Sequence, residues 1–286
     1  MKTAKLTQRL VECSLMIALA TVLSILKLAE MPYGGSITFA SMLPMIIVSY
    51  RCGLLWGLGA GTVFAAIQQL LGLNNLSYVT GWQAVLAVII IDYMLAFAAV
   101  CLGGVFRGRI KGDKTPGYSQ SRELALGTLL VCVIRYIFHT VAGATVWAGL
   151  SIPSEAALLY SIGYNATYMI PETIVTILVA MYIGEIIDFR KPMPRRFGII
   201  SREGSVGRMV AVISPYASAL VAVGALIADA ALIFPHLQNA ESGEFTFAYL
   251  SEVNWTAVIV ITAISAAISI GLLVYWKLAK DKTASN

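Results

Sequence analysis

The chain has 286 residues, of which 58% are hydrophobic and only 12% are charged, and its formal net charge is +5. A soluble domain usually carries about 25% charged residues. A chain this poor in charge cannot cover its surface with polar groups, so the composition excludes a soluble globular protein and predicts one solvated largely by lipid. The positive charge does not indicate nucleic-acid binding, because the basic residues fall between apolar stretches.

Eight apolar stretches follow one another along the chain, each long enough or nearly long enough to cross about 30 Å of hydrocarbon. They cover residues 10–30, 36–50, 53–72, 82–106, 122–148, 156–188, 208–234 and 253–278. The second is short enough to be tilted, broken or packed inside the bundle. The sixth is overlong and contains Pro171, where a kink is expected. The pattern predicts an all-α integral membrane bundle.

The positions of Lys and Arg predict the orientation. With the N-terminus in the cytoplasm, 18 of the 20 basic residues lie at inner ends of the stretches, and only Lys27 and Arg135 do not. The outer loops contain acidic residues instead, among them Glu155 and Glu241. By the positive-inside rule, the chain is expected to be a multi-pass plasma-membrane protein with both termini in the cytoplasm.

Several motifs are missing from the sequence. It contains no GxxxxGK[ST] phosphate-binding loop, so any ATP used in transport is expected to be hydrolysed by another chain. The four cysteines have no CxxC spacing, which argues against a disulfide framework and a zinc site. Neither a cofactor nor a metal is expected.

Polar residues inside the spans mark a candidate site, because charged groups in hydrocarbon usually face a cavity or a partner. They are Asp92 and Tyr93 in the fourth stretch, Arg135 and His139 in the fifth, spaced by four residues and followed at the same spacing by Gly143 and Trp147, and Tyr160, Ser161, Tyr164, Asn165, Tyr168 and Glu172 in the sixth. The four-residue steps of the fifth stretch drift by only about 40° each, which places those side chains on one helix face. The pattern predicts a pocket in the outer half of the membrane, formed by the fourth, fifth and sixth helices.

The residue types in this pocket suit an aromatic, cationic, water-soluble ligand. Trp, Tyr and His faces attract flat rings and organic cations. Asp92 can balance a fixed positive charge, and Asn165 can both donate and accept hydrogen bonds. A structural alternative is an Asp92–Arg135 ion pair that locks the fourth and fifth helices together, with His139 satisfied in the core.

At these residues the sequence resembles a known family. Residues 135–143, ending at Trp147, and residues 159–168 are similar to the fifth and sixth helices of the thiamine-specific S component of energy-coupling factor (ECF) transporters, the ThiT family. The Asp92–Tyr93 pair occupies the place of an acidic residue followed by Tyr. Residues 32–36 and 50–54 resemble the first outer loop and the turn between helices two and three. The resemblance covers about residues 8–190.

The resemblance implies roles for individual residues. Asp92 would face the thiazolium charge with Tyr93 beside it, and His139 and Trp147 would stack on the ligand rings. Polar pocket positions would be Arg135, Tyr160 and Asn165, and further candidate ligand contacts are Tyr33, Tyr78, Tyr164, Tyr168 and Glu172. The sequence departs from the family at Gly35, where some members place a ring-stacking Trp.

In the first stretch, Ser14 and Ala18 match the small-xxx-small motif through which such subunits contact the transmembrane coupling subunit. Small residues allow two helices to approach closely. An ordinary packing role within the chain is the alternative for this pair.

The expected organisation is a six-helix substrate-binding membrane domain over residues 1–190, followed by a cytoplasmic linker and two extra transmembrane helices over residues 191–286. The resemblance implies a subunit that captures thiamine from outside and works with a transmembrane coupling subunit and two ATPase subunits, without being an enzyme and without a nucleic-acid partner.

Other hypotheses remain open. The ligand is alternatively another vitamin or a thiamine-precursor pyrimidine. A self-sufficient ion-coupled carrier would use Asp92, Glu172 or Asp229 as a proton site. An intramembrane enzyme built on His139 with Asp92 or Glu172 is disfavoured, because no nucleophile or metal-ligand pair accompanies them at a suitable spacing.

Overall fold

The computed structural model describes residues 2–31, 35–79, 81–110, 116–146, 157–197, 205–237 and 248–284. The chain divides into two compact units, Met1–Phe197 and Gly198–Asn286, and each is described by itself. Within the described residues, seven helices are long and apolar enough to cross a membrane. The protein is therefore a multi-pass membrane protein with an all-α fold.

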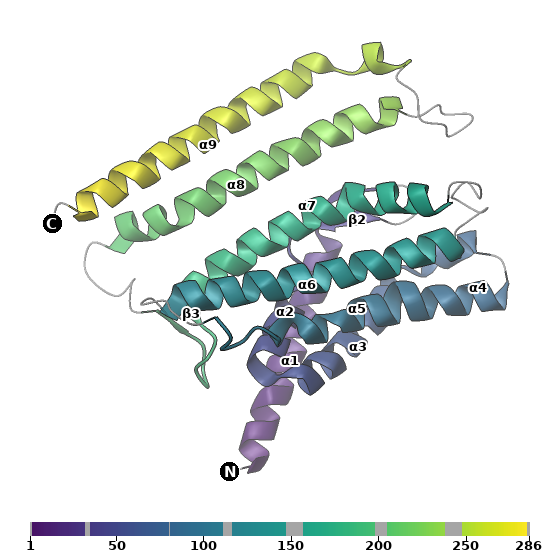
Figure 1. Ribbon diagram of the computed structural model, residues 1–286, viewed down its shortest axis with the longest axis horizontal. Helices are drawn as coiled ribbons and strands as arrows, with labels where there is room; N and C mark the ends of the chain where they lie inside the picture. The colour runs from purple at the N-terminus through teal and green to yellow at the C-terminus, as the bar shows by residue number, and fades with distance from the viewer. Residues whose placement is uncertain are drawn as a thin grey trace. The chain divides into compact units, whose positions relative to one another are not determined.

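The first unit is a bundle of apolar helices. They are α1 (Lys2–Ile25), α2 (Leu43–Cys52), α3 (Leu54–Leu71), a composite helix over Trp82–Gly104, α6 (Pro116–Thr145) and α7 (Ala157–Ile186). The composite helix consists of α4 (Trp82–Ala87), the π-helical segment Val88–Leu95, α5 (Ala96–Ala98) and the 3-10 segment Ala99–Gly104. π-Helical turns are frequent at functional sites. Helices α6 and α7 run alongside each other (Figure 1).

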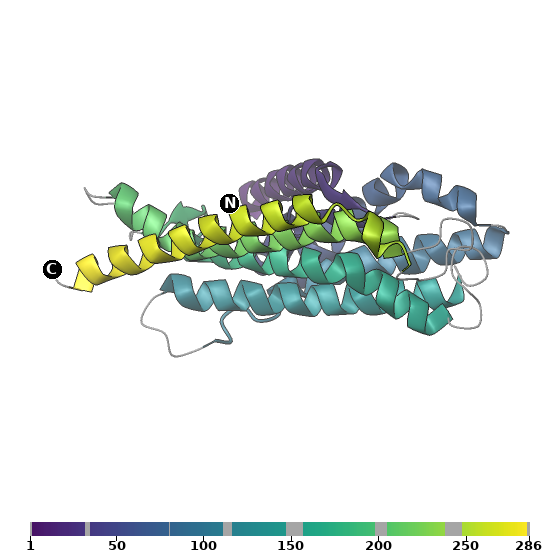
Figure 2. The ribbon, with the colours of Figure 1, turned by 90° about the horizontal axis from the view of Figure 1, so that it is seen from above.

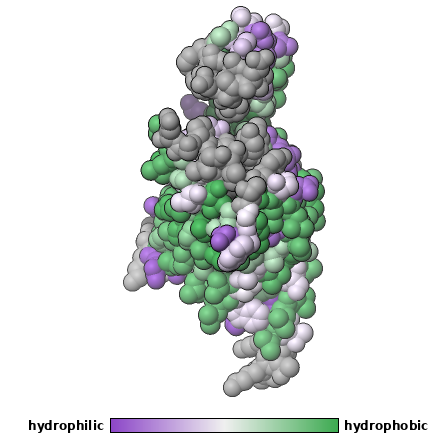
Figure 3. Space-filling model, turned by 90° about the vertical axis from the view of Figure 1, so that its right-hand side faces the viewer, coloured by the Kyte–Doolittle hydropathy of each residue, from purple (hydrophilic) through white to green (hydrophobic). Residues whose placement is uncertain are grey.

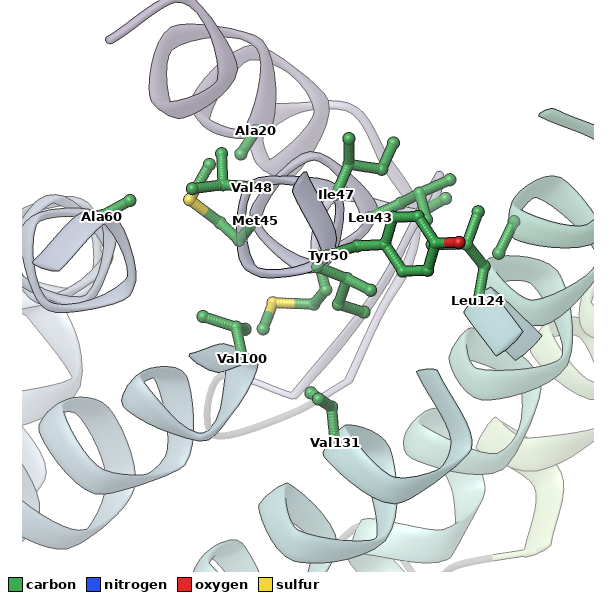
Figure 4. Packing of buried hydrophobic residues seen from close by; sticks show 14 of the residues in the cluster. Ala20, Leu43, Met45, Ile47, Val48, Tyr50, Ala60, Val100, Leu124 and Val131 are labelled. Atoms are coloured by element: carbon green, nitrogen blue, oxygen red, sulfur yellow. The ribbon is translucent and has the colours of Figure 1, made fainter. Parts of the chain in front are cut away.

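Helix α2 lies in the core of this unit. Every residue from Leu43 to Tyr50 is buried. Ala20 of α1, Val100 of the composite helix and Leu124 of α6 belong to the same buried cluster (Figure 4). A helix that is apolar on all sides must be covered by protein or lipid. The short second stretch is therefore packed inside the bundle, which was one of its three expected placements.

The segment before α2 contains a small β-hairpin that the sequence pattern did not predict. Strand β1 (Lys27–Glu30) pairs antiparallel with β2 (Ser36–Thr38). The apolar stretches expected over residues 10–30 and 36–50 were therefore too long at these ends, because α1 ends at Ile25 and α2 begins at Leu43. Strands of four and three residues are too short to show a clear alternating pattern.

A polar network ties the ends of α2, α6 and α7 together. The buried carboxylate of Glu123 accepts hydrogen bonds from Tyr50 (2.5 Å) and from Arg190 (2.9 Å). Nearby, Arg51 forms an ion pair with Glu12 of α1 and donates to backbone carbonyls of the segment after α7. That segment forms a second small hairpin, β3 (Ile187–Asp188) with β4 (Arg195–Arg196). The network therefore holds this end of the bundle together with hydrogen-bonded charges.

The second unit is a pair of long helices, α8 (Ser205–Ile233) and α9 (Trp255–Ala284), which contact each other and lie side by side in Figure 1, while α9 covers much of α8 in the view of Figure 2. Ser218 and Ser269 each donate to the other's backbone carbonyl at 3.1 Å. Thr262 donates to the carboxylate of Asp229 at 2.6 Å. Such hydrogen bonds stabilise helix pairs in lipid. From the sequence, Asp229 had a role only in the ion-coupled carrier hypothesis. In the structure it forms a contact between α8 and α9.

The surface agrees with a lipid environment. On the side shown in Figure 3, hydrophobic residues predominate among the coloured residues. Exposed apolar side chains occur along α1, α3, α6 and α9, for example Leu15, Leu55, Val133 and Ile259. Continuous apolar surface of this kind on several helices is expected where lipid replaces water as the solvent.

Candidate ligand-binding site

A cavity of about 550 Å³ lies in the first unit. Its wall includes the end of α1, the β1–β2 hairpin, the end of α3 with the 3-10 segment Leu73–Tyr78, the composite helix, α6 and α7. The sequence predicted a pocket between the composite helix, α6 and α7. That prediction was incomplete, because the hairpin and the ends of α1 and α3 supply roughly half of the wall.

Asp92 and His139 form a pair beside the cavity. The Nδ1 atom of His139 lies 2.9 Å from Oδ1 of Asp92, and about 14% of each side chain is exposed. Asp92 belongs to the π-helical segment Val88–Leu95, and His139 to α6. His139 lines the cavity, and Asp92 contacts the His139 ring without being part of the cavity wall. A carboxylate in this position orients the imidazole and places a negative charge close to the cavity.

A second buried pair lies in the cavity wall. Arg135 of α6 and Glu172 of α7 are 5% and 4% exposed, and their closest charged atoms are 3.6 Å apart. The hydroxyl of Thr38, on β2, donates to Glu172 at 2.7 Å. The Arg135 guanidinium lies 4.8 Å above the centre of the Phe97 ring. The Asp92–Arg135 ion pair considered from the sequence is therefore wrong, since Glu172 is the ion-pair partner of Arg135.

We expect replacement of Glu172 with alanine to destabilise the first unit. Removing one partner of a buried ion pair leaves an uncompensated charge, which costs about 3–5 kcal/mol. The measurement is the thermal unfolding midpoint of the detergent-purified protein. Glu172→Gln is expected to lose less, because its amide oxygen still accepts from Thr38.

The hairpin offers a matched control for this prediction. Glu30 pairs with Lys27 at 2.6 Å, but about 61% of its side chain is exposed. Exposed ion pairs contribute about 0–1 kcal/mol. Equal unfolding midpoints for Glu172→Ala and Glu30→Ala would show that the buried pair contributes no more than the exposed one.

An aromatic row continues the wall on the composite helix. The Tyr93 ring stacks on Phe97, with centroids 6.2 Å apart, and Phe97 meets His139 edge-on at 6.5 Å. Asn75 donates to the Tyr93 hydroxyl at 3.2 Å. A Cβ at position 72 would collide with that hydroxyl, so only glycine lets the tyrosine approach the end of α3 this closely. The row gives the cavity flat faces suited to a ring-shaped ligand.

The tyrosines of α7 are arranged along the helix. Tyr160, Tyr164 and Tyr168 contact one another in sequence, with ring centroids 6.4 Å and 5.7 Å apart. Of these three, Tyr168 lines the cavity. Gly35 donates its backbone N–H to the Tyr164 hydroxyl at 3.2 Å, and a Cβ at position 35 would meet the Tyr168 ring at 2.8 Å. In this chain the hairpin therefore packs directly on the tyrosines, and a Trp at position 35 would collide with them.

Asn165 has a different environment from the one expected. Its amide nitrogen donates to the Ser161 carbonyl at 2.9 Å, and its oxygen accepts from Tyr168 at 2.5 Å. Ser161 in turn donates to the Thr140 carbonyl of α6. Asn165 is buried and, among the described residues, neither it nor Tyr160 lines the cavity. In this structure Asn165 orients Tyr168 and lies in the α6–α7 contact.

Two of the predicted contacts, Tyr33 and Trp147, lie outside the described residues. For Tyr78, the structure describes the backbone, in the 3-10 segment Leu73–Tyr78, but not the side chain. Ser14 and Ala18 are both exposed on α1, whereas Cys13 and Ala20 on the other side of the helix are buried.

Sequence reasoning missed the wall formed by α1 and α3. Gln68 of α3 and Ser24 of α1 both line the cavity, and the Gln68 amide donates to the Ser24 hydroxyl oxygen at 2.8 Å. Asn74 and Asn75 line it from the following segment. The available signal was a polar residue near the end of each apolar stretch, Ser24 in the first and Gln68 in the third, because polar groups in hydrocarbon are costly. Within the described residues, no three His, Cys, Asp or Glu side chains lie close enough together to hold a metal ion.

These features define a membrane protein whose helices enclose a polar, aromatic-lined cavity for a small molecule. Residues 10–188 match the family described as thiamine transporter protein (Thia_YuaJ), which is more than half of the chain. The chain therefore belongs to the thiamine transporter family. The matched residues end before α8 and α9.

Individual relatives agree with this assignment. The chain is 32% identical over 187 residues to the thiamine transporter ThiT of Bacillus subtilis, an alignment that covers 63% of this chain and 91% of that protein. A solved structure of ThiT from Listeria monocytogenes is similar, with a TM-score of 0.52 and 25% identity. That comparison covers 62% of this chain and 93% of the solved chain.

Proposed function

We propose that this chain binds thiamine from outside the cell and is the substrate-binding S component of an ECF transporter. In this proposal a transmembrane coupling subunit and two ATPase subunits complete the transporter, because the sequence contains no phosphate-binding loop of its own. Family membership supports thiamine as the ligand. The observation that carries the proposal is the Asp92–His139 pair beside an aromatic cavity.

The balance of charge around the cavity suits a monocation. Lys27 is paired with Glu30, and Arg135 with Glu172, so these four charges compensate one another. Asp92, which contacts His139, adds a further carboxylate next to the cavity. Coulombic attraction is several times stronger in a partly buried site than in water. The thiazolium ring of thiamine carries one such positive charge.

The cavity also suits two linked rings. Its volume of about 550 Å³ lies in the range of small-molecule sites, which is about 300–1,000 Å³. Tyr93, Phe97, His139 and Tyr168 offer ring faces or edges to a ligand. We propose Tyr93, Arg135 and His139 as direct contacts, with Asp92 acting through its charge and its hold on His139.

The proposed orientation places the cavity toward the outside. The end of α1, the hairpin and the end of α3 form part of its wall. If α1 starts in the cytoplasm, α1 and α3 both end on the outer side, and the hairpin follows α1 there. In the network of Arg51, Glu123 and Arg190, Arg51 lies at the turn between α2 and α3, Glu123 lies near the start of α6 and Arg190 follows α7, and these ends are cytoplasmic in the same orientation. The positive-inside rule favours this arrangement.

Isothermal titration calorimetry of the purified chain tests the ligand. We expect saturable heat with thiamine at one site per chain, and no heat with riboflavin or biotin, which carry no fixed positive charge. Heat with another vitamin and none with thiamine would overturn the ligand assignment while leaving a role in vitamin binding. Binding of the free thiamine-precursor pyrimidine as tightly as thiamine would favour the precursor as the ligand, because that fragment lacks the thiazolium charge.

A further inference from the structure

Gln68 and Ser24 form a polar contact on the side of the cavity formed by α1 and α3. Gln68 lies one turn before the end of α3, and Ser24 lies near the end of α1. Both residues line the cavity, and the Gln68 Nε2 atom is 2.8 Å from the Ser24 Oγ atom. This contact has no part in the charge balance described above, because both side chains are neutral.

The hydrogen bonds of Ser24 fix which way the Gln68 amide faces. A serine hydroxyl has one proton to donate. Ser24 donates it to the backbone carbonyl of Thr21 at 2.8 Å, so toward Gln68 its oxygen can only accept. The donating NH2 of Gln68 must therefore face Ser24, and its carbonyl oxygen faces the other way. This chain of donors agrees with the amide orientation in which Nε2 faces Ser24.

The carbonyl oxygen of Gln68 is available to a ligand. Among the described residues, none donates a hydrogen bond to this Oε1 atom. The atom is also not one of the described buried atoms that lack a partner, so it remains accessible. Gln68, a residue of the cavity wall, thus has an acceptor oxygen without a donor in the described part of the chain, while one of its two N–H groups is bonded to Ser24.

We infer that Gln68 is a specificity-determining residue that accepts a hydrogen bond from the amino group of an aminoheterocyclic ligand. The inference rests on the proposed function, in which that group is the exocyclic amine of the thiamine pyrimidine. An aromatic amine donates but hardly accepts, because its lone pair is delocalised into the ring. It therefore complements a wall that offers an oriented acceptor. A ligand with an oxygen in place of the amine cannot donate to this Oε1 atom and would place a second acceptor opposite it.

The test compares the affinities of two ligands by titration calorimetry. One is thiamine, and the other is its 4-oxo analogue, in which oxygen replaces the exocyclic amine. The wild-type protein is expected to prefer thiamine. In Gln68→Met, which keeps the length of the side chain but removes the acceptor, the ratio of the two dissociation constants is expected to fall about 3- to 10-fold. Gln68→Glu keeps an acceptor oxygen and is expected to keep the preference.

Two further variants separate recognition from a change in structure. Ser24→Ala removes the group that orients the amide, so the preference for thiamine is expected to fall while Gln68 is still present. Gln69→Met is the matched control, since Gln69 follows directly on the same helix, is 8% exposed and is not part of the cavity wall among the described residues. This control is expected to leave the ratio unchanged.

The outcomes distinguish the inference from the function on which it rests. Absence of thiamine binding by the wild-type protein would overturn the proposed ligand, and the role of Gln68 with it. Thiamine binding with the same ratio in wild type and in Gln68→Met would overturn the role of Gln68 alone. An equal fall in the ratio for Gln69→Met would also overturn it, because the effect would then arise from α3 as a whole.

Discussion

Thiamine binding is expected to weaken by about 1–3 kcal/mol when Asp92 is replaced with asparagine, the range for losing a charge-assisted contact in a desolvated site. This corresponds to roughly a 5- to 150-fold higher dissociation constant. Asparagine is nearly the same size as aspartate and can still hydrogen-bond to His139, so the substitution removes mainly the negative charge. Titration calorimetry on the purified variant measures the change.

A neutral ligand provides the control for this prediction. A thiamine analogue without the fixed thiazolium charge is expected to lose much less affinity on Asp92→Asn, because it has no charge for Asp92 to balance. Glu30→Gln serves as the matched variant, since Glu30 is a carboxylate of the same cavity that is exposed and paired with Lys27. If the charged and the neutral ligand weaken equally, Asp92 acts only by holding His139 in place, and the electrostatic part of the proposed function is wrong.

The sequence predicted the membrane helices well because the length of an apolar stretch is a direct physical requirement of the bilayer. Helices α3, α6, α7, α8 and α9 all fall on predicted stretches, and α2 was identified as too short for an ordinary span. The hairpin of β1 and β2 was missed because its strands are short and adjoin apolar stretches. The π-helical segment was also unpredictable, since its apolar residues do not distinguish it from an α-helix.

The site could be predicted only in part. The four-residue spacing placed Arg135 and His139 on one face of α6, and both line the cavity. The ion-pair partner of Arg135 could not be predicted, because the spans of the pocket contain two acids, Asp92 and Glu172, and the sequence does not rank their distances from Arg135. In the structure Glu172 of α7 lies beside Arg135, and Asp92 contacts His139 instead. Spacing along one helix is fixed by local geometry, whereas pairing between helices depends on packing.

The roles of Ser14 and Ala18 decide between a subunit and a self-sufficient carrier. Both side chains are exposed on α1, which weakens the alternative of ordinary packing within the first unit. Small residues on an exposed helix face allow another helix to approach closely in the membrane. If that helix belongs to a coupling subunit, this face matters for uptake and not for ligand binding, because neither residue lines the cavity.

Uptake of thiamine by cells is therefore expected to be abolished when Ser14 and Ala18 are both replaced with leucine. Binding by the purified variant is expected to stay within about twofold of wild type, as for most substitutions at exposed positions. A matched variant with Ser14→Ala and Ala18→Gly keeps the helix face small and is expected to transport normally, which separates bulk from loss of the original side chains. Two results would contradict the proposal: the leucine variant transports normally with its partners present, or the wild-type chain alone in liposomes accumulates thiamine under a proton or sodium gradient. The second result would make the chain a carrier in its own right, and α1 would then need no partner helix.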